Sequence, residues 1–406
     1  MAELKRTLGV GAAIFFGVGS ILGAGIYTII GKVAGFSGNM LWLSFLIASI
    51  TAICTVFSYS ELSAAYPKSG GEYEYARKAF GKNTGLFLGI VISLNGIVSG
   101  ATVATGFAGY LAELIQVDFL IGSLGIITLL FIVNISGIRE SSVVNIIFTV
   151  IEAAGLLYII YLASGSVGKV DLLDLPPDGI NGLLMASALA FYAYIGFEEI
   201  VKLAEETNDP HKNIPRALFS ASIIVLIGYT VVGICAVSAL PFAELAASES
   251  PLAAIAKNES GQTGILIISI IALFATSNTI LSNMLGSSRV LLNMAGDSKK
   301  FAWLSKVSHK RKTPINALIL ILAVMYGFAL IGDIETIARI ANVFIFMTFI
   351  VVNLAVIRLR FVDANLERPY RIPFAVGKMP VIPVFGILLT LLLFGYNFYS
   401  LLIGQQ

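Results

Sequence analysis

A glycine-rich segment in the middle of an apolar run offers backbone groups that could bind a charged small molecule. Residues 19–27 read GSILGAGIY and lie within the run 8–34, which is long enough to cross a bilayer. Glycine destabilises a helix interior by about 1 kcal/mol relative to alanine, and backbone that opens inside a membrane is tolerated only beside protein or a water-filled cavity. The segment therefore predicts a binding site at the membrane midplane or, as the alternative, a close helix contact through small residues.

A second apolar run is interrupted in a similar way. Residues 190–199 read AFYAYIGFEE, so Gly196 and two carboxylates, Glu198 and Glu199, fall within the run 181–203. Discontinuous helices at matching places in two halves of a chain indicate an inverted-repeat transporter. The start of a helix offers N–H groups that suit a carboxylate, and its end offers carbonyls that suit an ammonium group. The two breaks together suit an α-amino acid, although inorganic ions use the same geometry.

Glu152 is the third feature of the sequence that could take part in chemistry. It lies within the run 143–163, roughly 14 Å along a helix that rises 1.5 Å per residue, and an acidic residue at that depth indicates a functional role. Burial disfavours the charged form, so this carboxyl group could carry a proton. It could instead stay ionised and bind a cation, either sodium or the ammonium group of a basic substrate. The third alternative is a protonated carboxyl that hydrogen-bonds a neighbouring helix and takes no part in turnover.

Other kinds of chemistry find little support in the sequence. The two cysteines, Cys54 and Cys235, lie in apolar runs, and the two histidines, His211 and His309, lie in polar loops. This distribution argues against a disulfide framework, a metal-ligand cluster and a catalytic triad. We therefore expect neither an enzyme nor a cofactor.

The composition is that of a membrane protein. Hydrophobic residues make up 57% of the 406 residues, charged residues make up 12%, and the mean hydropathy is +0.90, whereas a soluble domain has about 25% charged residues. We expect one transmembrane domain covering residues 1–406, built from spans of about 20 residues. The eleven predicted spans are 8–34, 40–66, 84–115, 119–136, 143–163, 181–203, 215–240, 263–292, 314–331, 336–357 and 380–402.

The positive charges are strongly asymmetric about these spans. If the N-terminus is cytoplasmic, all but four of the 26 lysines and arginines fall on the inner side, the exceptions being Lys32, Lys169, Lys257 and Arg339. The positive-inside rule therefore predicts a cytoplasmic N-terminus, and the odd number of spans places the C-terminus outside. The minimal loops suggest a cell (inner) membrane. Topology explains the basic loops, so no nucleic-acid site or lipid-specific site is predicted.

Several motifs resemble a known family. GSILGAGIY at 19–27 is followed by ELSAAYPKSGGEY at 61–73, FYAYIGFEE at 191–199, LAEETNDP at 203–210 and NIPR at 213–216. In this order they resemble the first, second and sixth helices, with the loop after the sixth, of the amino acid–polyamine–organocation superfamily of secondary transporters. The resemblance implies an all-α polytopic protein with a LeuT-like core of five plus five inverted-repeat helices. Helices 1–5 would occupy about 8–163, helices 6–10 about 181–357 and an extra helix about 380–402, without the usual twelfth helix.

The same resemblance implies a substrate held between the first and sixth helices and flanked by the third and eighth. Backbone groups would bind the amino acid headgroup and leave the substrate side chain to other residues. The N–H groups that would meet the carboxylate, and then the carbonyls that would meet the ammonium group, belong to Gly23, Ala24 and Gly25, and to Ile21, Tyr192, Ala193 and Ile195.

Three further side chains take possible roles from the resemblance. Tyr194 and Phe197 could line or gate the pocket, or could be ordinary packing residues. Relatives that are proton-coupled and independent of sodium often carry a lysine where Glu152 stands, and its ammonium group takes the place of a sodium ion. The reversed charge in this chain makes Glu152 the candidate for coupling.

These expectations lead to a secondary active transporter that moves amino acids by alternating access with proton coupling. Helices one, two, six and seven would rock against helices three, four, eight and nine. The alternative is a cationic amino acid or polyamine exchanger, with sodium as another coupling ion; a channel or a membrane binding subunit is the non-carrier alternative. Glu61 and Glu198, near the cytoplasmic ends of their helices, are expected in structural roles, including an ion pair with a loop arginine such as Arg77 or Arg139.

Overall fold

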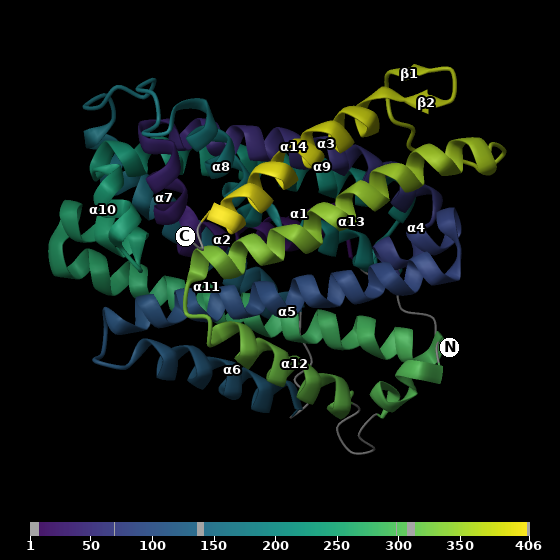
Figure 1. Cartoon of the computed structure of the whole chain (residues 1–406), viewed down its shortest axis with the longest axis horizontal. Coiled ribbons are helices and arrows are strands. Elements are labelled where there is room, and N and C mark those ends of the chain that lie inside the picture. The colour runs from purple at the N-terminus through teal and green to yellow at the C-terminus, as the bar shows by residue number, and fades with distance from the viewer. Residues whose placement is uncertain (1–7, 69, 136–141, 298, 307–312, 404–406) are drawn as a thin grey trace.

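The computed structural model describes residues 8–68, 70–135, 142–297, 299–306 and 313–403, which are mostly helical (Figure 1). The helices that correspond to the predicted spans are α1 (Val10–Leu22), α2 (Ala24–Ser37), α3 (Leu41–Ala65), α5 (Lys82–Ala112), α6 (Phe119–Ile135), α7 (Ser142–Ala163), α8 (Gly179–Ala190), α9 (Pro210–Ala239), α11 (Pro251–Asp297), α12 (Ile315–Ala329), α13 (Ile334–Val362) and α14 (Val381–Ile403).

Each predicted span corresponds to a helix or to a broken pair of helices. Within the described residues, eight helical stretches are long and apolar enough to cross a membrane, and α1, α6 and α12 are shorter apolar helices. Most predicted ends agree to within a few residues. The eighth span is the exception, because α11 begins at Pro251 rather than at residue 263. α11 has two parts that meet at Gly261, where φ is 65° and the backbone is not helical. The first part of α11 precedes the apolar window from which the eighth span was predicted.

Short elements lie between the spans or, as with η3 and η4, within the broken sixth span, and a hydropathy window does not resolve them. The strands pair antiparallel, with Ala375 opposite Pro380 and Val376 opposite Met379. The short elements are α4 (Gly71–Phe80), α10 (Phe242–Ala247), β1 (Ala375–Val376), β2 (Met379–Pro380) and the 3₁₀ segments η1 (Gly38–Met40), η2 (Ser164–Ser166), η3 (Phe191–Tyr194), η4 (Phe197–Leu203) and η5 (Lys299–Ser305). Figure 1 shows α4 and the β1–β2 hairpin at one end of the bundle and α10 at the opposite end.

The helices pack in two groups. α3 lies along α9, and α1 packs against α9 as well, whereas α5 lies along α11 and also contacts α6 and α12. The first group contains the predicted helices one, two and seven together with the broken sixth, and the second contains helices three, four, eight and nine. These are the same two groups of helices that were expected from the resemblance, helices one, two, six and seven and helices three, four, eight and nine. α13 contacts members of both groups, and α14 packs against α13, α3 and α8.

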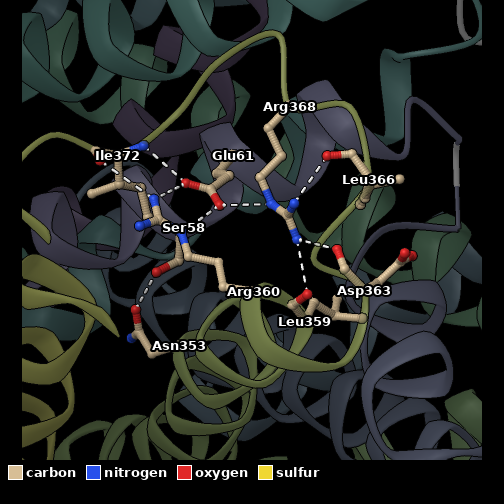
Figure 2. A network of polar contacts seen from close by, with 9 residues as sticks. All are labelled: Ser58, Glu61, Asn353, Leu359, Arg360, Asp363, Leu366, Arg368 and Ile372. Carbon is tan, nitrogen blue, oxygen red and sulfur yellow. Dashed lines mark hydrogen bonds and ion pairs between the residues drawn. The ribbon is translucent and has the colours of Figure 1, made fainter. Parts of the chain in front are cut away.

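A buried ion-pair network ties the end of α3 to the end of α13 (Figure 2). The Glu61 carboxylate accepts hydrogen bonds from Arg360, whose Nε lies at 2.8 Å and whose Nη2 reaches the other oxygen, and from the main-chain N–H of Ile372 at 2.8 Å. Arg368 Nε lies 3.3 Å from the same carboxylate. Arg368 also donates to the carbonyls of Leu359, Asp363 and Leu366.

The predicted ion-pair partner of Glu61 differs from the one that the structure shows. The sequence suggested Arg77 or Arg139; Glu61 pairs instead with Arg360 and Arg368, and Arg139 lies outside the described residues. The cause is the length of α13, which continues to Val362 rather than ending near residue 357. Arg360 therefore sits on the last helical turn, from which it reaches α3.

We expect Glu61→Gln to lower the stability of the protein strongly. Removing one partner of a buried ion pair leaves the other charge uncompensated, which costs about 3–5 kcal/mol, and Glu61 and Arg360 are both almost fully buried. Chemical unfolding of the purified protein in detergent measures this loss. Glu367→Gln makes the same chemical change at an exposed position of the neighbouring loop and should leave the unfolding midpoint unchanged; equal midpoints for the two variants would contradict the assignment.

Candidate functional site

The first predicted break is confirmed. α1 ends at Leu22 and α2 begins at Ala24, with Gly23 between them at φ −11° and ψ −166°. The Gly23 N–H, expected to meet a carboxylate, donates to the Gly19 carbonyl at 3.2 Å and closes α1. The first N–H groups of α2 and the last carbonyls of α1 lack partners within their own helices. The N–H groups of α2 and the carbonyls of α1 therefore lie on the two sides of the same helix break.

The second predicted break is also confirmed. α8 continues into the 3₁₀ turn η3, after which Ile195 is extended and Gly196 adopts φ 129°. The chain then enters η4. The Gly196 N–H donates to the Glu198 carboxylate at 2.8 Å, so a side chain satisfies the opened backbone at this point.

The two breaks touch each other through their backbones. A Cβ atom added to Gly196 would lie 2.2 Å from the carbonyl oxygen of Ser20, and a Cβ added to Gly25 would lie 2.8 Å from the Cα of Ala193. Both distances are shorter than real Cβ contacts, so each position requires glycine in this arrangement. Gly196 requires it for a second reason, because L-residues with a side chain rarely adopt its positive φ.

A small central cavity of about 20 Å³ lies where the breaks meet. A single water needs a cavity of roughly 10–15 Å³, so in this conformation the cavity has room for little more than one water. Five of the seven predicted site residues line it: Ile21, Gly23, Gly25, Tyr192 and Ile195.

Ala193 does not line the central cavity and packs against Gly25. Ala24 is the first residue of α2, and its side chain lies outside the part of the structure that is described. The sequence did not identify four further lining residues, Ser20, Ser99, Val103 and Thr279. Ser99 and Val103 come from α5 and Thr279 from α11, the elements that correspond to the third and eighth helices.

A polar cavity of about 90 Å³, which we call the vestibule, adjoins the central cavity. The two share Ser20, Ser99, Ile195 and Thr279 as lining residues. From there the vestibule is lined by amide and hydroxyl side chains of α5 and α11, and by α4 and η4 towards the end of the bundle where α4 lies (Figure 1). Its charged lining residues are Glu72, Glu198, Glu199 and Lys202.

Tyrosine hydroxyls hold several of the carbonyls around the breaks. Tyr229 donates to the Ile21 carbonyl at 2.8 Å, and Tyr192 donates to the Ser99 carbonyl at 3.0 Å. A carbonyl oxygen has two lone pairs, so Ile21 keeps one acceptor position beside the cavity. The buried Tyr229 therefore fixes one carbonyl of the first break, and Tyr192 ties the second break to α5.

Tyr194 and Phe197 line neither cavity. The Tyr194 hydroxyl donates to the Phe45 carbonyl at 2.9 Å, and its ring packs 5.2 Å from that of Tyr229. Phe197 packs between Tyr59 and Phe349, with ring centroids 5.4 and 5.0 Å apart. In this conformation both side chains belong to an aromatic cluster of the core.

Glu152 is fully buried beside the first break. It lies on α7, one helical turn from Thr149, whose Oγ1 would be only 1.8 Å from a Cβ on Gly19 of α1. No hydrogen bond reaches either carboxylate oxygen from the described residues, although the Asn278 side chain of α11 lies beside them. Asn278 also lines the vestibule. One side chain therefore lies between an unpaired carboxyl group and a polar cavity.

The described residues contain no group of three His, Cys, Asp or Glu side chains that could hold a metal ion. The polar groups at the two breaks and the two cavities are main-chain N–H and carbonyl groups, hydroxyl and amide side chains, and the charged side chains of the vestibule, with the Glu152 carboxyl group nearby.

The chain is similar to membrane transporters over almost its whole length. The family model described as "Amino acid permease" matches residues 8–403. The branched-chain amino acid permease BcaP of Bacillus subtilis is 27% identical, with 96% of this chain and 88% of the relative covered. The methylthioribose transporter of the same organism is 27% identical, with 94% and 86% covered.

A plant relative differs in length. The vacuolar cationic amino acid transporter 4 of Arabidopsis thaliana is 30% identical, with 89% of this chain covered, and the chain spans 64% of that relative. The match of the family model from residue 8 to residue 403 includes both helix breaks, the central cavity and the vestibule. The chain therefore belongs to the amino acid permease family.

Proposed function

We propose that this multi-pass amino acid transporter binds the headgroup of its substrate between the two helix breaks and moves it by alternating access. The substrate carboxylate would meet the N–H groups at the start of α2, at Ala24 and Gly25, because the Gly23 N–H donates to the Gly19 carbonyl in this conformation. Its ammonium group would meet carbonyls of Ile21 and of the segment 192–195. The observation that carries the proposal is the direct backbone contact of two broken helices around a cavity that adjoins a polar vestibule.

We further propose that the vestibule faces the cytoplasm. It extends towards the end of the bundle that holds α4 and the β1–β2 hairpin, where loops rich in lysine and arginine occur. The positive-inside rule assigns such loops to the cytoplasm, so the N-terminus is cytoplasmic and the C-terminus is outside, with the cell membrane as the location. Residues 1–406 act as one transport domain with two groups of helices that rock against each other.

We propose protons as the coupling ion, carried by Glu152. An unpaired carboxyl group in a buried site is held more easily as the neutral acid than as the anion, and the vestibule beside Asn278 offers a route for proton exchange with water. A proton taken up on Glu152 would remove a buried negative charge beside the first break, which gives the proton a way to act on α1.

Uptake into proteoliposomes tests this proposal. The measurement uses a labelled amino acid mixture, with and without an inward proton gradient, in sodium-containing and sodium-free buffers. Saturable, stereoselective accumulation that needs the proton gradient and is unaffected by sodium is the expected result. Accumulation that requires sodium would overturn the proton coupling, and the absence of saturable flux under every condition would overturn the carrier mechanism.

The acidic vestibule favours a second candidate, a cationic amino acid or polyamine exchanger. Three carboxylates, Glu72, Glu198 and Glu199, and one ammonium group, Lys202, line it, and Lys202 pairs with Glu199. Burial raises the pKa of Glu72, with Lys202 acting against it, and Tyr59 donates to the Glu72 carboxylate at 2.9 Å. Acidic groups outnumber the single ammonium group on the route to the central cavity, and those that are ionised attract cationic substrates.

Glu72→Gln should weaken competition by lysine and arginine for uptake by about fivefold. A carboxylate close to a hydrated cation contributes about 1 kcal/mol, which is roughly fivefold in affinity. Because the pKa of Glu72 is raised, its ionised fraction grows with pH, so competition by cations should strengthen with pH in the wild type and change less in the variant. Glu74→Gln, on the same helix but outside the vestibule lining, is the control; equal effects of both variants would contradict this candidate.

A further inference from the structure

A basic cavity lies at the end of α13, away from the central cavity and the vestibule. Its volume is about 220 Å³, and four cationic side chains line it together with Ala364 and Leu366. The four are Arg360, Arg368, Arg371 and Lys378. They come from the last turn of α13, the loop that follows it, and the turn of the β1–β2 hairpin.

Two of the four cations are engaged by the protein. Arg368 uses its guanidinium group on the Glu61 carboxylate and on three carbonyls (Figure 2). Arg360 pairs with the same carboxylate through Nε and Nη2. Its Nη1, however, is buried and has no hydrogen-bond partner among the described residues. A buried guanidinium nitrogen without an acceptor is costly, so this donor points to a ligand that supplies oxygen atoms.

The other two cations are free to bind a ligand. Arg371 and Lys378 are exposed, and no ion pair is found for either within the described part of the chain. Glu61 pairs with Arg360 and Arg368, and the cavity lining holds four cationic side chains and no acidic one among the described residues. Arginine and lysine together are the usual partners of a phosphate group, since the guanidinium fork donates in pairs and the ammonium group supplies a point charge.

The elements that line the basic cavity also carry exposed apolar side chains. Phe374 and Val376 on the hairpin are 78% and 77% exposed, and Phe361 and Val362 at the end of α13 are 53% and 70% exposed. Exposed aromatic and aliphatic residues beside cations are typical of the boundary between hydrocarbon and headgroups. A lipid would bring its phosphate to the cations and its acyl chains to these apolar side chains.

We propose that this cavity binds a phosphate group, supplied by the headgroup of an anionic phospholipid. Arg360 Nη1, Arg371 and Lys378 are the donors, and Phe374 and Val376 contact the lipid chains. The sequence alone pointed to no lipid-specific site in these loops, because the charges of residues 360 and 378 come together only when the hairpin folds back on α13. A free phosphate ion has the same chemistry and is the other source that the test distinguishes.

The test measures binding to the purified full-length protein in detergent, by native mass spectrometry and by the shift of the unfolding temperature. The probes are short-chain phosphatidylglycerol, phosphatidylcholine with the same chains, and inorganic phosphate. The variant is Arg371→Gln with Lys378→Gln. The control is Lys82→Gln with Arg216→Gln, two exposed cations outside the cavity. All four side chains are exposed, so both double variants should fold and unfold like the wild type in the absence of a probe.

We expect phosphatidylglycerol to bind the wild type and the control at least tenfold more tightly than phosphatidylcholine, and to bind the Arg371 and Lys378 variant at least tenfold more weakly. Inorganic phosphate that binds with the same dependence on the two side chains would retain the phosphate site and assign it to the free ion. Phosphatidylglycerol that binds both double variants equally, or no saturable binding of either anionic probe, would overturn the proposal.

Discussion

Gly196→Ala should reduce uptake at least a hundredfold. The new methyl group would start 2.2 Å from the Ser20 carbonyl oxygen, whereas ordinary contacts begin at 3.4 Å, so the two breaks must separate by more than 1 Å. Displacements of about 1 Å at a binding site can reduce rates about a hundredfold. The positive φ of 129° adds backbone strain of about 1–3 kcal/mol. Initial rates of labelled amino acid uptake into proteoliposomes measure the effect.

A matched control separates the effect of backbone strain from that of the steric clash between the two breaks. Gly168 also has a positive φ, 90°, but nothing lies within 4 Å of an added Cβ. Gly168→Ala therefore imposes backbone strain without disturbing the junction of the breaks, and its uptake should stay close to that of the wild type. Size-exclusion chromatography of both variants reports whether they are folded. Uptake by a folded Gly196→Ala protein within threefold of the wild type would show that the contact of the breaks is not needed for transport.

Glu152→Gln should abolish proton-driven accumulation and preserve exchange. An inward gradient of one pH unit drives roughly tenfold accumulation when one proton accompanies each substrate. Glutamine keeps the size of the side chain but cannot take up or release a proton, so the internal to external ratio should fall to one. Counterflow of labelled against unlabelled substrate needs no proton movement and should continue. The two assays on the same vesicles separate coupling from binding.

The control for this substitution is Glu244→Gln, which makes the same chemical change at an exposed position of α10 and should accumulate substrate like the wild type. Tenfold accumulation that survives in Glu152→Gln would exclude Glu152 as the proton carrier. Loss of both accumulation and counterflow would point instead to a role in binding, either of the substrate ammonium group or of sodium, and repeating the assay in sodium-free buffer distinguishes these two.

Local signals in the sequence predicted the features that depend on a few neighbouring residues. The breaks at Gly23 and Gly196 were found because glycines inside an apolar run are a local anomaly, and the spans were found because hydropathy is summed over one window. α4 and the β1–β2 hairpin were missed because they are short and lie between the apolar windows.

Features that depend on distant segments could not be predicted. Glu61 and Arg360 are 299 residues apart in the chain, and the sequence around either residue does not indicate that the other is its partner. Ser99 and Thr279 lie in regular helical stretches of α5 and α11, where nothing in the local sequence distinguishes a hydroxyl residue that packing brings to the central cavity. The register of α5 and α11 against the breaks determines these positions, and that register is a property of tertiary packing.

The backbone contact between the breaks has a consequence for how such a transporter can diversify. Every residue type except proline presents the same main-chain N–H and carbonyl groups. Point mutations at most positions of the breaks would therefore leave the proposed headgroup binding intact, except mutations to proline and mutations of the glycines. In the proposed mode of binding, the surfaces that would meet the substrate side chain lie on other helices, at residues such as Ser99, Val103 and Thr279, which line the central cavity. A lineage can therefore change which substrate it carries through a few substitutions on α5 and α11, while its ability to hold an amino acid is inherited unchanged.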